Sequence, residues 1–171
     1  SDYDRAAPFG TGHIKVGGNY AASLKALIRG KNEGFPSVIF RNSADRRYID
    51  EAGPANFFGI KGNSYITPDS PSILPSITNL SLRQLAKDIG LNVELRSVAV
   101  DELDSFEEAG ACGTAAVITP IGKIVDRDTG KVVEYSKDGK AGPISTKLYN
   151  KLKGIQEGTE EDIHNWNTVV E

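Results

Sequence analysis

The sequence predicts an α/β (α+β) fold in which a mixed sheet is flanked by helices. Its length of 171 residues fits one domain, and 39% of the residues are hydrophobic, enough to build a core. Helical and strand patterns are interspersed along the chain, and hairpin signals join several strands, which argues against a purely parallel doubly wound sheet. We therefore expect residues 1–171 to form a single domain.

The first two elements are expected within the first 40 residues. After Asn19, the residues Leu24, Leu27 and Ile28 recur at helical spacing and predict one apolar helix face. Residues 37–40 (SVIF) are typical of a short buried strand.

A hairpin and a second helix are expected next. Residues 56–60 and 64–67 predict two strands, and the Lys-Gly-Asn sequence at 61–63 is a hairpin signal between them. Apolar residues at helical spacing predict a helix over 80–89, which ends at Gly90.

The second half of the chain alternates in the same way. The β-branched segment 92–100 predicts a strand, and the acidic start of 101–109 favours a short helix. A last helix is expected around residues 148–155. Further strands are expected at 115–119, 121–125 and 132–135.

Charge and composition narrow the function classes. Twenty basic against 23 acidic residues give a net charge of −3, which argues against general nucleic-acid or anionic-membrane binding. One cysteine and two isolated histidines offer neither a disulfide framework nor metal-ligand spacing. No apolar run is long enough for a membrane helix, so a cytoplasmic protein is expected. The chain has no methionine and opens on a dense, functional-looking stretch, so we expect a piece of a longer protein.

Lys15 is the first candidate for chemistry. It lies between Ile14 and Val16 in the glycine-rich segment 10–20. Glycines allow a planar ligand to approach the backbone, and apolar neighbours lower the pKa of a lysine, as a Schiff-base nucleophile requires. The alternative from the residues alone is a surface lysine beside glycine turns, and the segment does not match a phosphate-binding loop.

Two further segments predict anion binding. Residues 76–79 begin the second predicted helix, where free backbone amides and the Thr78 hydroxyl could hold a phosphate, although such residues commonly serve only as caps. The small residues 110–116 precede a predicted strand, and a turn there could direct amides and the Thr114 hydroxyl at an anion; the alternative is a tight turn that packs closely.

A carboxylate and a thiol complete the candidates. Glu51, in the sequence YIDEAG, could keep a heterocyclic nitrogen protonated, or it could be an ordinary solvated acid. A dyad between Cys112 and His13 or His164 stays open at this level.

Taken together, these segments resemble one known family. The sequence YDRAAPFGTGHIKVGGNYAASL is similar to the catalytic segment of branched-chain amino-acid aminotransferases, which are fold-type IV enzymes that use pyridoxal 5′-phosphate (PLP). Further segments match in the same order: YIDEAG with NFF, SILPSITNLSLRQLAKDIG, ACGTAAVITPIG, and the late tryptophan in HNWNTVVE. The resemblance implies the large C-terminal PLP-binding domain, with a mixed sheet or pseudo-barrel flanked by helices.

The resemblance also implies roles for individual residues. Lys15 corresponds to the lysine that forms the internal aldimine and shuttles the proton, and Tyr20 to the tyrosine that hydrogen-bonds the phenolic oxygen of PLP. Glu51 corresponds to the carboxylate beside the pyridine nitrogen, and Leu74 to the leucine on one ring face.

The anion sites follow from the same resemblance. The amides of Ile77 and Thr78, together with Thr114, correspond to the phosphate cradle. The turn Gly113-Thr114-Ala115 corresponds to the one that receives the substrate carboxylate.

This chain departs from the family pattern at several positions. Asn79 replaces a common arginine, and Cys112 falls where relatives often carry threonine, so we expect Cys112 to make the enzyme sensitive to bulky thiol reagents. Ala116 and Thr119 replace the redox cysteine pair of mammalian relatives, so that regulation should be absent. Pro54 replaces a small or polar residue, and nothing in the sequence explains that exchange.

The activity implied is PLP-dependent transamination of Leu, Ile or Val with 2-oxoglutarate. Alternatives are a D-amino-acid aminotransferase or aminodeoxychorismate lyase of the same fold, or a non-catalytic ligand-binding domain. Family members are about twice this length, and their smaller N-terminal domain supplies a phosphate-binding arginine and part of the substrate pocket. We therefore expect a homodimer at full length and little activity from the 171-residue chain alone.

Overall fold

The computed structural model describes residues 2–170. The helices of this part of the chain are α1 (Gly17–Asn32), α2 (Ile77–Asp88), α3 (Pro143–Glu157) and the 3₁₀ helix η1 (Val100–Ser105). Its strands are β1 (Ile39–Arg41), β2 (Ile49–Ala52), β3 (Ala55–Lys61), β4 (Ser64–Pro68), β5 (Asn92–Arg96), β6 (Glu108–Gly113), β7 (Val117–Pro120), β8 (Lys123–Val125) and β9 (Val132–Glu134). The α/β (α+β) class predicted from the sequence is confirmed.

The main sheet is mixed, as predicted. Five strands run in the order β1-β2-β3-β4-β5, while β6 pairs with β3 and β7 with β6. Among these pairs only β4 and β5 are parallel, because α2 connects them as a crossover. Strands β8 and β9 form a separate antiparallel hairpin.

The predicted hairpin at residues 61–63 is confirmed. Lys61 pairs with Ser64 across the β3–β4 turn, and Gly62 has a φ of 53°, a left-handed conformation that glycine adopts without strain. The second predicted helix is also confirmed, since α2 is followed by Gly90 with a φ of 87°.

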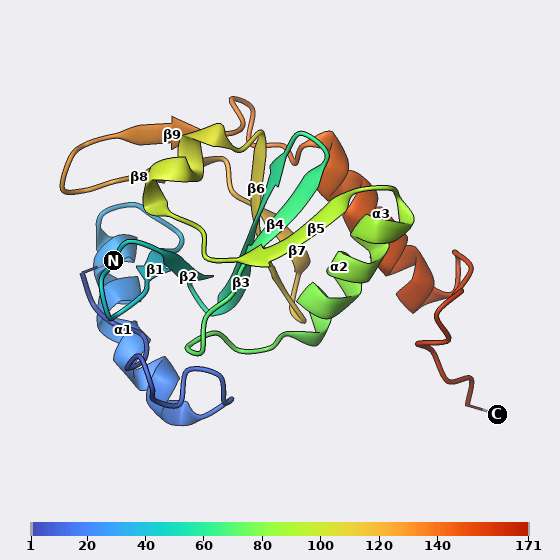
Figure 1. The fold of residues 1–171 in the computed structure, drawn as a ribbon, viewed down its shortest axis with the longest axis horizontal. Coiled ribbons are helices and arrows are strands. Elements are labelled where there is room, and N and C mark those ends of the chain that lie inside the picture. Colours follow the sequence, from blue (N-terminus) through green and yellow to red (C-terminus); the bar gives the residue numbers. More distant parts are fainter. Residues whose placement is uncertain (1, 171) are drawn as a thin grey trace.

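Both faces of the sheet are covered, so the chain has two apolar cores. Phe58 and Tyr65 face α2 and α3, which lie side by side on one flank of the sheet (Figure 1). Phe57 and Ile66, their neighbours in sequence, belong to the core on the opposite face together with residues of η1. β3 is therefore buried on both faces from Asn56 to Ile60 rather than alternating in burial.

The short helix predicted over 101–109 is wrong in its second half. η1 ends at Ser105, and β6 begins at Glu108. The small residues 110–113, predicted to be a turn, are also part of β6. A Cβ atom at Gly110 would lie 2.4 Å from the Phe58 ring, so these small residues are needed where the strand crosses an aromatic side chain.

Other boundaries also moved. β2 had no counterpart in the prediction, and the predicted strand 92–100 ends at Arg96. Beyond that point the chain turns so that Val98 enters the core and its carbonyl accepts the Ile49 N–H at 2.8 Å. Tertiary contacts, rather than local pattern, set these boundaries.

α1 forms where predicted, but two residues of its apolar face are exposed. Leu24 and Ile28 are 54% and 56% exposed, whereas Ser23, Ala26 and Gly30 are buried. A Cβ atom on Gly30 would lie 2.7 Å from Val38, so small side chains allow α1 to pack closely on its inner side. Within residues 2–170, no helix is long and apolar enough to cross a membrane.

Candidate active site

Glu51 is buried at the centre of the site. It lies on β2, and only 4% of its side chain is exposed. Its Oε2 is 3.3 Å from the Arg5 Nε, and its Oε1 accepts the Leu74 N–H at 3.0 Å and the Asn56 side-chain N–H at 3.4 Å. The sequence-based alternative of a solvated acid is therefore wrong for Glu51.

The electrostatics of Glu51 are set by competing effects. Burial raises the pKa of the Glu51 carboxyl, while the Arg5 guanidinium and the Leu74 N–H lower it. Asp50 raises this pKa, and Lys15 lowers it through its positive charge. That last interaction places Lys15 within electrostatic reach of Glu51.

Arg5 joins the Lys15 segment to this carboxylate. Its guanidinium, with a side chain 10% exposed, also donates to the carbonyl oxygens of Gly12, at 3.2 Å, and of Ser72. At Gly12 an added Cβ would lie 2.3 Å from the Ser72 carbonyl oxygen. Glycine is therefore required where this segment crosses the loop that carries Leu74.

Asn19 fixes the turn that precedes Lys15. Its side-chain amide donates to the carbonyls of Thr11 at 2.8 Å and Ile14 at 2.9 Å, and accepts the Thr11 hydroxyl at 3.0 Å. Lys15 itself is exposed, and its neighbour Ile14 is 45% exposed. The expectation that apolar neighbours shield the lysine is therefore wrong for this chain, because Ile14 lies open to solvent and Val16 is only half-buried.

The start of α2 fits the predicted anion site. Ser76 is its N-cap and accepts the Asn79 N–H, as the helix-start prediction implied. Ile77 is 75% exposed, Thr78 is buried, and the first turn holds no acidic residue. The positive end of the helix dipole therefore meets no acidic side chain of its own first turn.

The turn between β6 and β7 lies next to β3. Cys112 pairs with Asn56, and Glu51 pairs with Asn56 on the other side of β3. Thr114 and Ala115 are exposed in this turn, and it closes at Val117, whose φ of 59° is unusual for a β-branched residue.

The structure brings some of the predicted site residues to Glu51 but not others. Leu74 bonds directly to Glu51, and Lys15 interacts with it electrostatically. Tyr20 lies on the first turn of α1 and is 46% exposed. Among residues 2–170, the hydrogen bonds around Glu51 do not extend to Tyr20 or Thr114.

Three residues that hold the candidate site together had no individual prediction: Arg5, Asn19 and Asn56. Arg5 and Asn19 fall inside the segment whose resemblance identified Lys15, and Asn56 opens the NFF sequence. The only sequence feature that could have identified them as part of a site is a charged or amide side chain near a glycine-rich segment.

Cys112 is inaccessible, which corrects the expectation of sensitivity to thiol reagents. It is 1% exposed, and burial raises the pKa of its thiol to about 12, only partly opposed by Tyr65. Its partner is Tyr65, and His164 bonds Asp88 at 2.7 Å, so the structure gives no support to a Cys112–His dyad. Among residues 2–170, no cluster of metal-ligating side chains is present.

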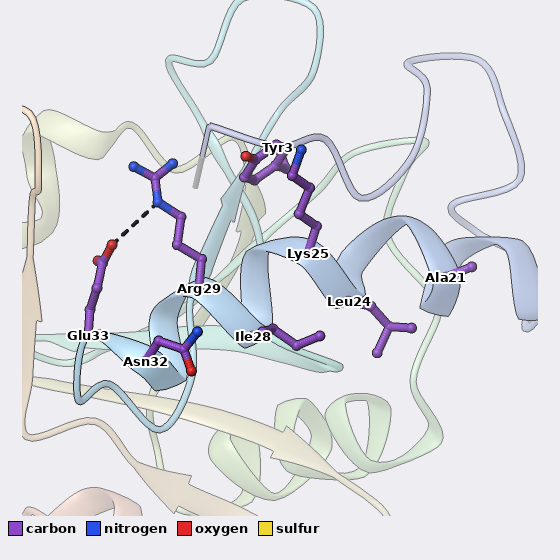
Figure 2. A pocket seen from close by; sticks show the side chains of 8 residues that line it. All are labelled: Tyr3, Ala21, Leu24, Lys25, Ile28, Arg29, Asn32 and Glu33. Atoms are coloured by element: carbon purple, nitrogen blue, oxygen red, sulfur yellow. Dashed lines mark hydrogen bonds and ion pairs between the residues drawn. The ribbon is translucent and has the colours of Figure 1, made fainter.

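Two grooves lie away from Glu51 and its hydrogen-bond partners. One, of about 610 Å³, runs along α1, where Figure 2 shows Leu24 and Ile28 beside the Arg29–Glu33 ion pair. The Lys25 ammonium lies 4.9 Å from the centre of the Tyr3 ring at the same groove. The other, of about 600 Å³, lies between α2, α3 and the C-terminal tail.

Comparison with known proteins establishes the family. The chain belongs to the amino-transferase class IV family, which matches residues 2–124. It is 49% identical to the branched-chain-amino-acid aminotransferase of Haemophilus influenzae over 178 aligned residues, covering 100% of this chain and 51% of the relative.

Solved structures agree in fold. The branched-chain amino acid aminotransferase of Escherichia coli matches with a TM-score of 0.84 and 30% identity, over 97% of this chain and 52% of that one. The PLP (holo) form of the enzyme from Thermobaculum terrenum matches with a TM-score of 0.79 and 32% identity, over 94% and 50% of the two chains. The chain therefore spans about half the length of the relatives it matches.

Proposed function

We propose that this chain is the PLP-binding part of an enzyme that transaminates Leu, Ile and Val with 2-oxoglutarate. The observation that carries the proposal is the buried Glu51 carboxylate, held by Arg5 and the Leu74 amide within electrostatic reach of an exposed lysine. The branched-chain aminotransferases among its relatives support the choice of substrates.

The residues present fit PLP by their chemistry. PLP has an aldehyde that a lysine amine condenses with, a ring nitrogen that a carboxylate keeps protonated, and a dianionic phosphate. Lys15 supplies an accessible amine. Glu51 supplies a carboxylate whose Oε2 is paired with the Arg5 guanidinium. The start of α2 supplies amides at Ile77 and Thr78.

Arg5 stabilises the charge of Glu51. A buried carboxylate takes up a proton readily unless a cation and N–H donors stabilise its charge. Arg5, Leu74 and Asn56 provide these, so Glu51 is able to remain ionised and hold a proton on a ring nitrogen. When bound, PLP supplies a protonated ring that accepts the electron pair left at the substrate Cα.

Lys15 moves the proton in this proposal. As a free amine, its Nζ removes the proton from the substrate Cα and later returns one. The amides and hydroxyl of Gly113, Thr114 and Ala115 bind the substrate carboxylate, while Tyr20 and Leu74 hold the ring. The exposure of Thr114 and Lys15 is compatible with access by small molecules.

The complete protein is part of the proposal. Because the chain spans about half of its relatives, we infer that a smaller N-terminal domain completes the phosphate site and pocket. We further propose a homodimer in the cytoplasm, with small-molecule substrates as its ligands. Intact-mass measurement of the gene product would show whether that N-terminal half exists.

The decisive experiment is borohydride reduction of the full-length protein mixed with PLP, followed by peptide mapping. The label is expected on Lys15, with Lys15→Ala unlabelled and Lys31→Ala, an exposed lysine on α1, as matched control. Keto-acid formation from L-Leu is then compared with that from D-Ala. Faster turnover of D-Ala would support a D-amino-acid aminotransferase, and no labelling at all would support a non-catalytic domain.

A further inference from the structure

Asn79, on the first turn of α2, belongs to a buried polar cluster that ends at Glu51. Asn79 and Asn56 are 7% and 4% exposed, and Tyr65 and Thr67 are still less exposed. Polar groups buried this deeply need partners, because leaving one unpaired is strongly destabilising. The hydrogen bonds of the cluster therefore determine which atom of each amide faces which neighbour.

One end of the cluster orients Asn79. The Thr67 hydroxyl donates its only hydrogen to the Phe57 carbonyl at 2.7 Å, so towards Asn79 it acts as an acceptor. The Asn79 Nδ2 donates to it at 3.0 Å, and the Tyr65 hydroxyl donates to the Asn79 Oδ1 at 2.9 Å. Reversing the Asn79 amide would set its oxygen against the Thr67 oxygen.

Asn79 in turn orients Asn56. The Asn79 Nδ2 also donates to the Asn56 Oδ1 at 3.4 Å. The Asn56 Nδ2 then faces away and donates to the Glu51 Oε1 at 3.4 Å and the Leu74 carbonyl at 3.2 Å. A reversed Asn56 would place its oxygen against two acceptor oxygens.

We infer that Asn79 is a positioning residue for Glu51, because it orients the Asn56 amide so that an N–H donor rather than an oxygen faces that carboxylate. The consequence for catalysis rests on the proposed function, in which Glu51 holds the proton of the ring nitrogen. An arginine at this position would have only donor atoms and could not accept the Tyr65 hydroxyl. The asparagine therefore fits the neighbours that it has in this chain.

The other charges around Glu51 do not depend on Asn79. Arg5 from the N-terminal segment, Lys15 before α1 and Asp50 beside it on β2 are the charged groups that influence its titration. Substituting Asn79 leaves all three in place. A change in Glu51 titration then reports the direction in which the Asn56 amide points.

The test is a carbon-13 NMR titration of the glutamate carboxyls in the 171-residue chain, with Glu51→Gln identifying the signal of Glu51. In Asn79→Asp, which replaces the N–H donor by oxygen, the pKa of Glu51 is expected to rise by about one unit or more. Asn79→Leu and Tyr65→Phe add no charge and should raise it less, in the same direction. Asn92→Asp, an exposed residue on β5, is the matched control for added charge.

An unchanged Glu51 pKa in Asn79→Leu would overturn the inference, whatever the thermal stability of the variant. If Asn79→Asp does not fold, Asn79→Leu, which removes the amide without adding charge, still decides it. This titration needs no PLP, so its outcome is independent of whether Lys15 becomes labelled.

Discussion

The two sides of the candidate active site differ in how firmly the protein holds them. On one side, Glu51 is buried and bonded to Arg5, Leu74 and Asn56. On the other, Lys15 and Thr114 are exposed. The chain thus fixes the electrostatics at one end of the site and leaves the Lys15 amine accessible at the other, where the proposed mechanism requires it to move.

The largest expected effect separates reactivity from stability at Lys15. In the full-length protein, Lys15→Ala should lower transamination by at least about 10²–10⁴-fold, the range typical of general acid–base catalysis. Because the side chain is exposed, the free energy of unfolding should change by no more than about 0.5 kcal/mol. Steady-state kinetics and urea unfolding measure the two; a variant that retains wild-type turnover would remove Lys15 from the mechanism.

Arg5→Ala should have the opposite profile and lower stability strongly. It leaves the Glu51 carboxylate buried without its cation, which costs about 3–5 kcal/mol by the measured cost of breaking buried ion pairs. Arg46→Ala is the control, since that side chain is 41% exposed and its ion pair with Asp4 should contribute at most about 1 kcal/mol. Equal losses in urea unfolding of the two variants would contradict the contrast between buried and exposed sides.

Gly12→Ala tests the contact that joins the two sides. Its new Cβ would lie 2.3 Å from the Ser72 carbonyl, so we expect a loss of about 1–3 kcal/mol from forced backbone displacement. At Gly17, an added Cβ would meet no atom within 4 Å, so Gly17→Ala should be neutral or stabilising. Thermal unfolding of both variants measures the difference, and a neutral Gly12→Ala would show that the segment is loosely held.

The smallest expected effect is a pH dependence at Glu51. Burial raises its pKa, so the folded chain holds this proton more tightly than the unfolded chain. The contribution of Glu51 to stability is therefore fully present below its ordinary pKa of 4.5 and is lost as the pH rises through the raised value.

We accordingly expect the stability of the wild type relative to Glu51→Gln to fall from pH 4.5 towards neutrality. The fall should be about 1.4 kcal/mol for every pH unit by which the pKa of Glu51 in the folded chain exceeds 4.5. Urea unfolding across this pH range measures it, with the exposed Glu161→Gln as matched control. A relative stability that rises with pH would mean that Arg5 outweighs burial.

Local sequence signals predicted the elements that depend on local chemistry. The Lys-Gly-Asn turn at 61–63 and the Gly90 stop after α2 are examples, because a left-handed glycine leaves a clear mark in the sequence. β2 and β6 were missed because their strand character comes from pairing with β3 and from packing against Phe58.

The site divides in the same way. Resemblance and helix-start chemistry pointed to Lys15, Glu51 and the start of α2 as candidates, whereas no sequence signal indicated the burial of Glu51 against Arg5. That ion pair joins residues 46 positions apart in sequence, and no periodicity links them. The apolar face predicted for α1 is present but exposed, because spacing shows that a helix has a face, but not what covers it.

The anchoring of residues 5–15 has a consequence for sequence evolution. Surface loops normally accept inserted residues, since lengthening a flexible loop costs little. Here Arg5 is tied to Glu51, Gly12 lies against Ser72, and Asn19 holds the turn before Lys15. The Ser72 hydroxyl also donates towards the carbonyl oxygens of Ala7, at 3.3 Å, and Pro8, at 3.5 Å, so even the turn around Phe9, which is 97% exposed, is held at its base. Homologous sequences should accordingly vary in residue type within this segment while keeping its length.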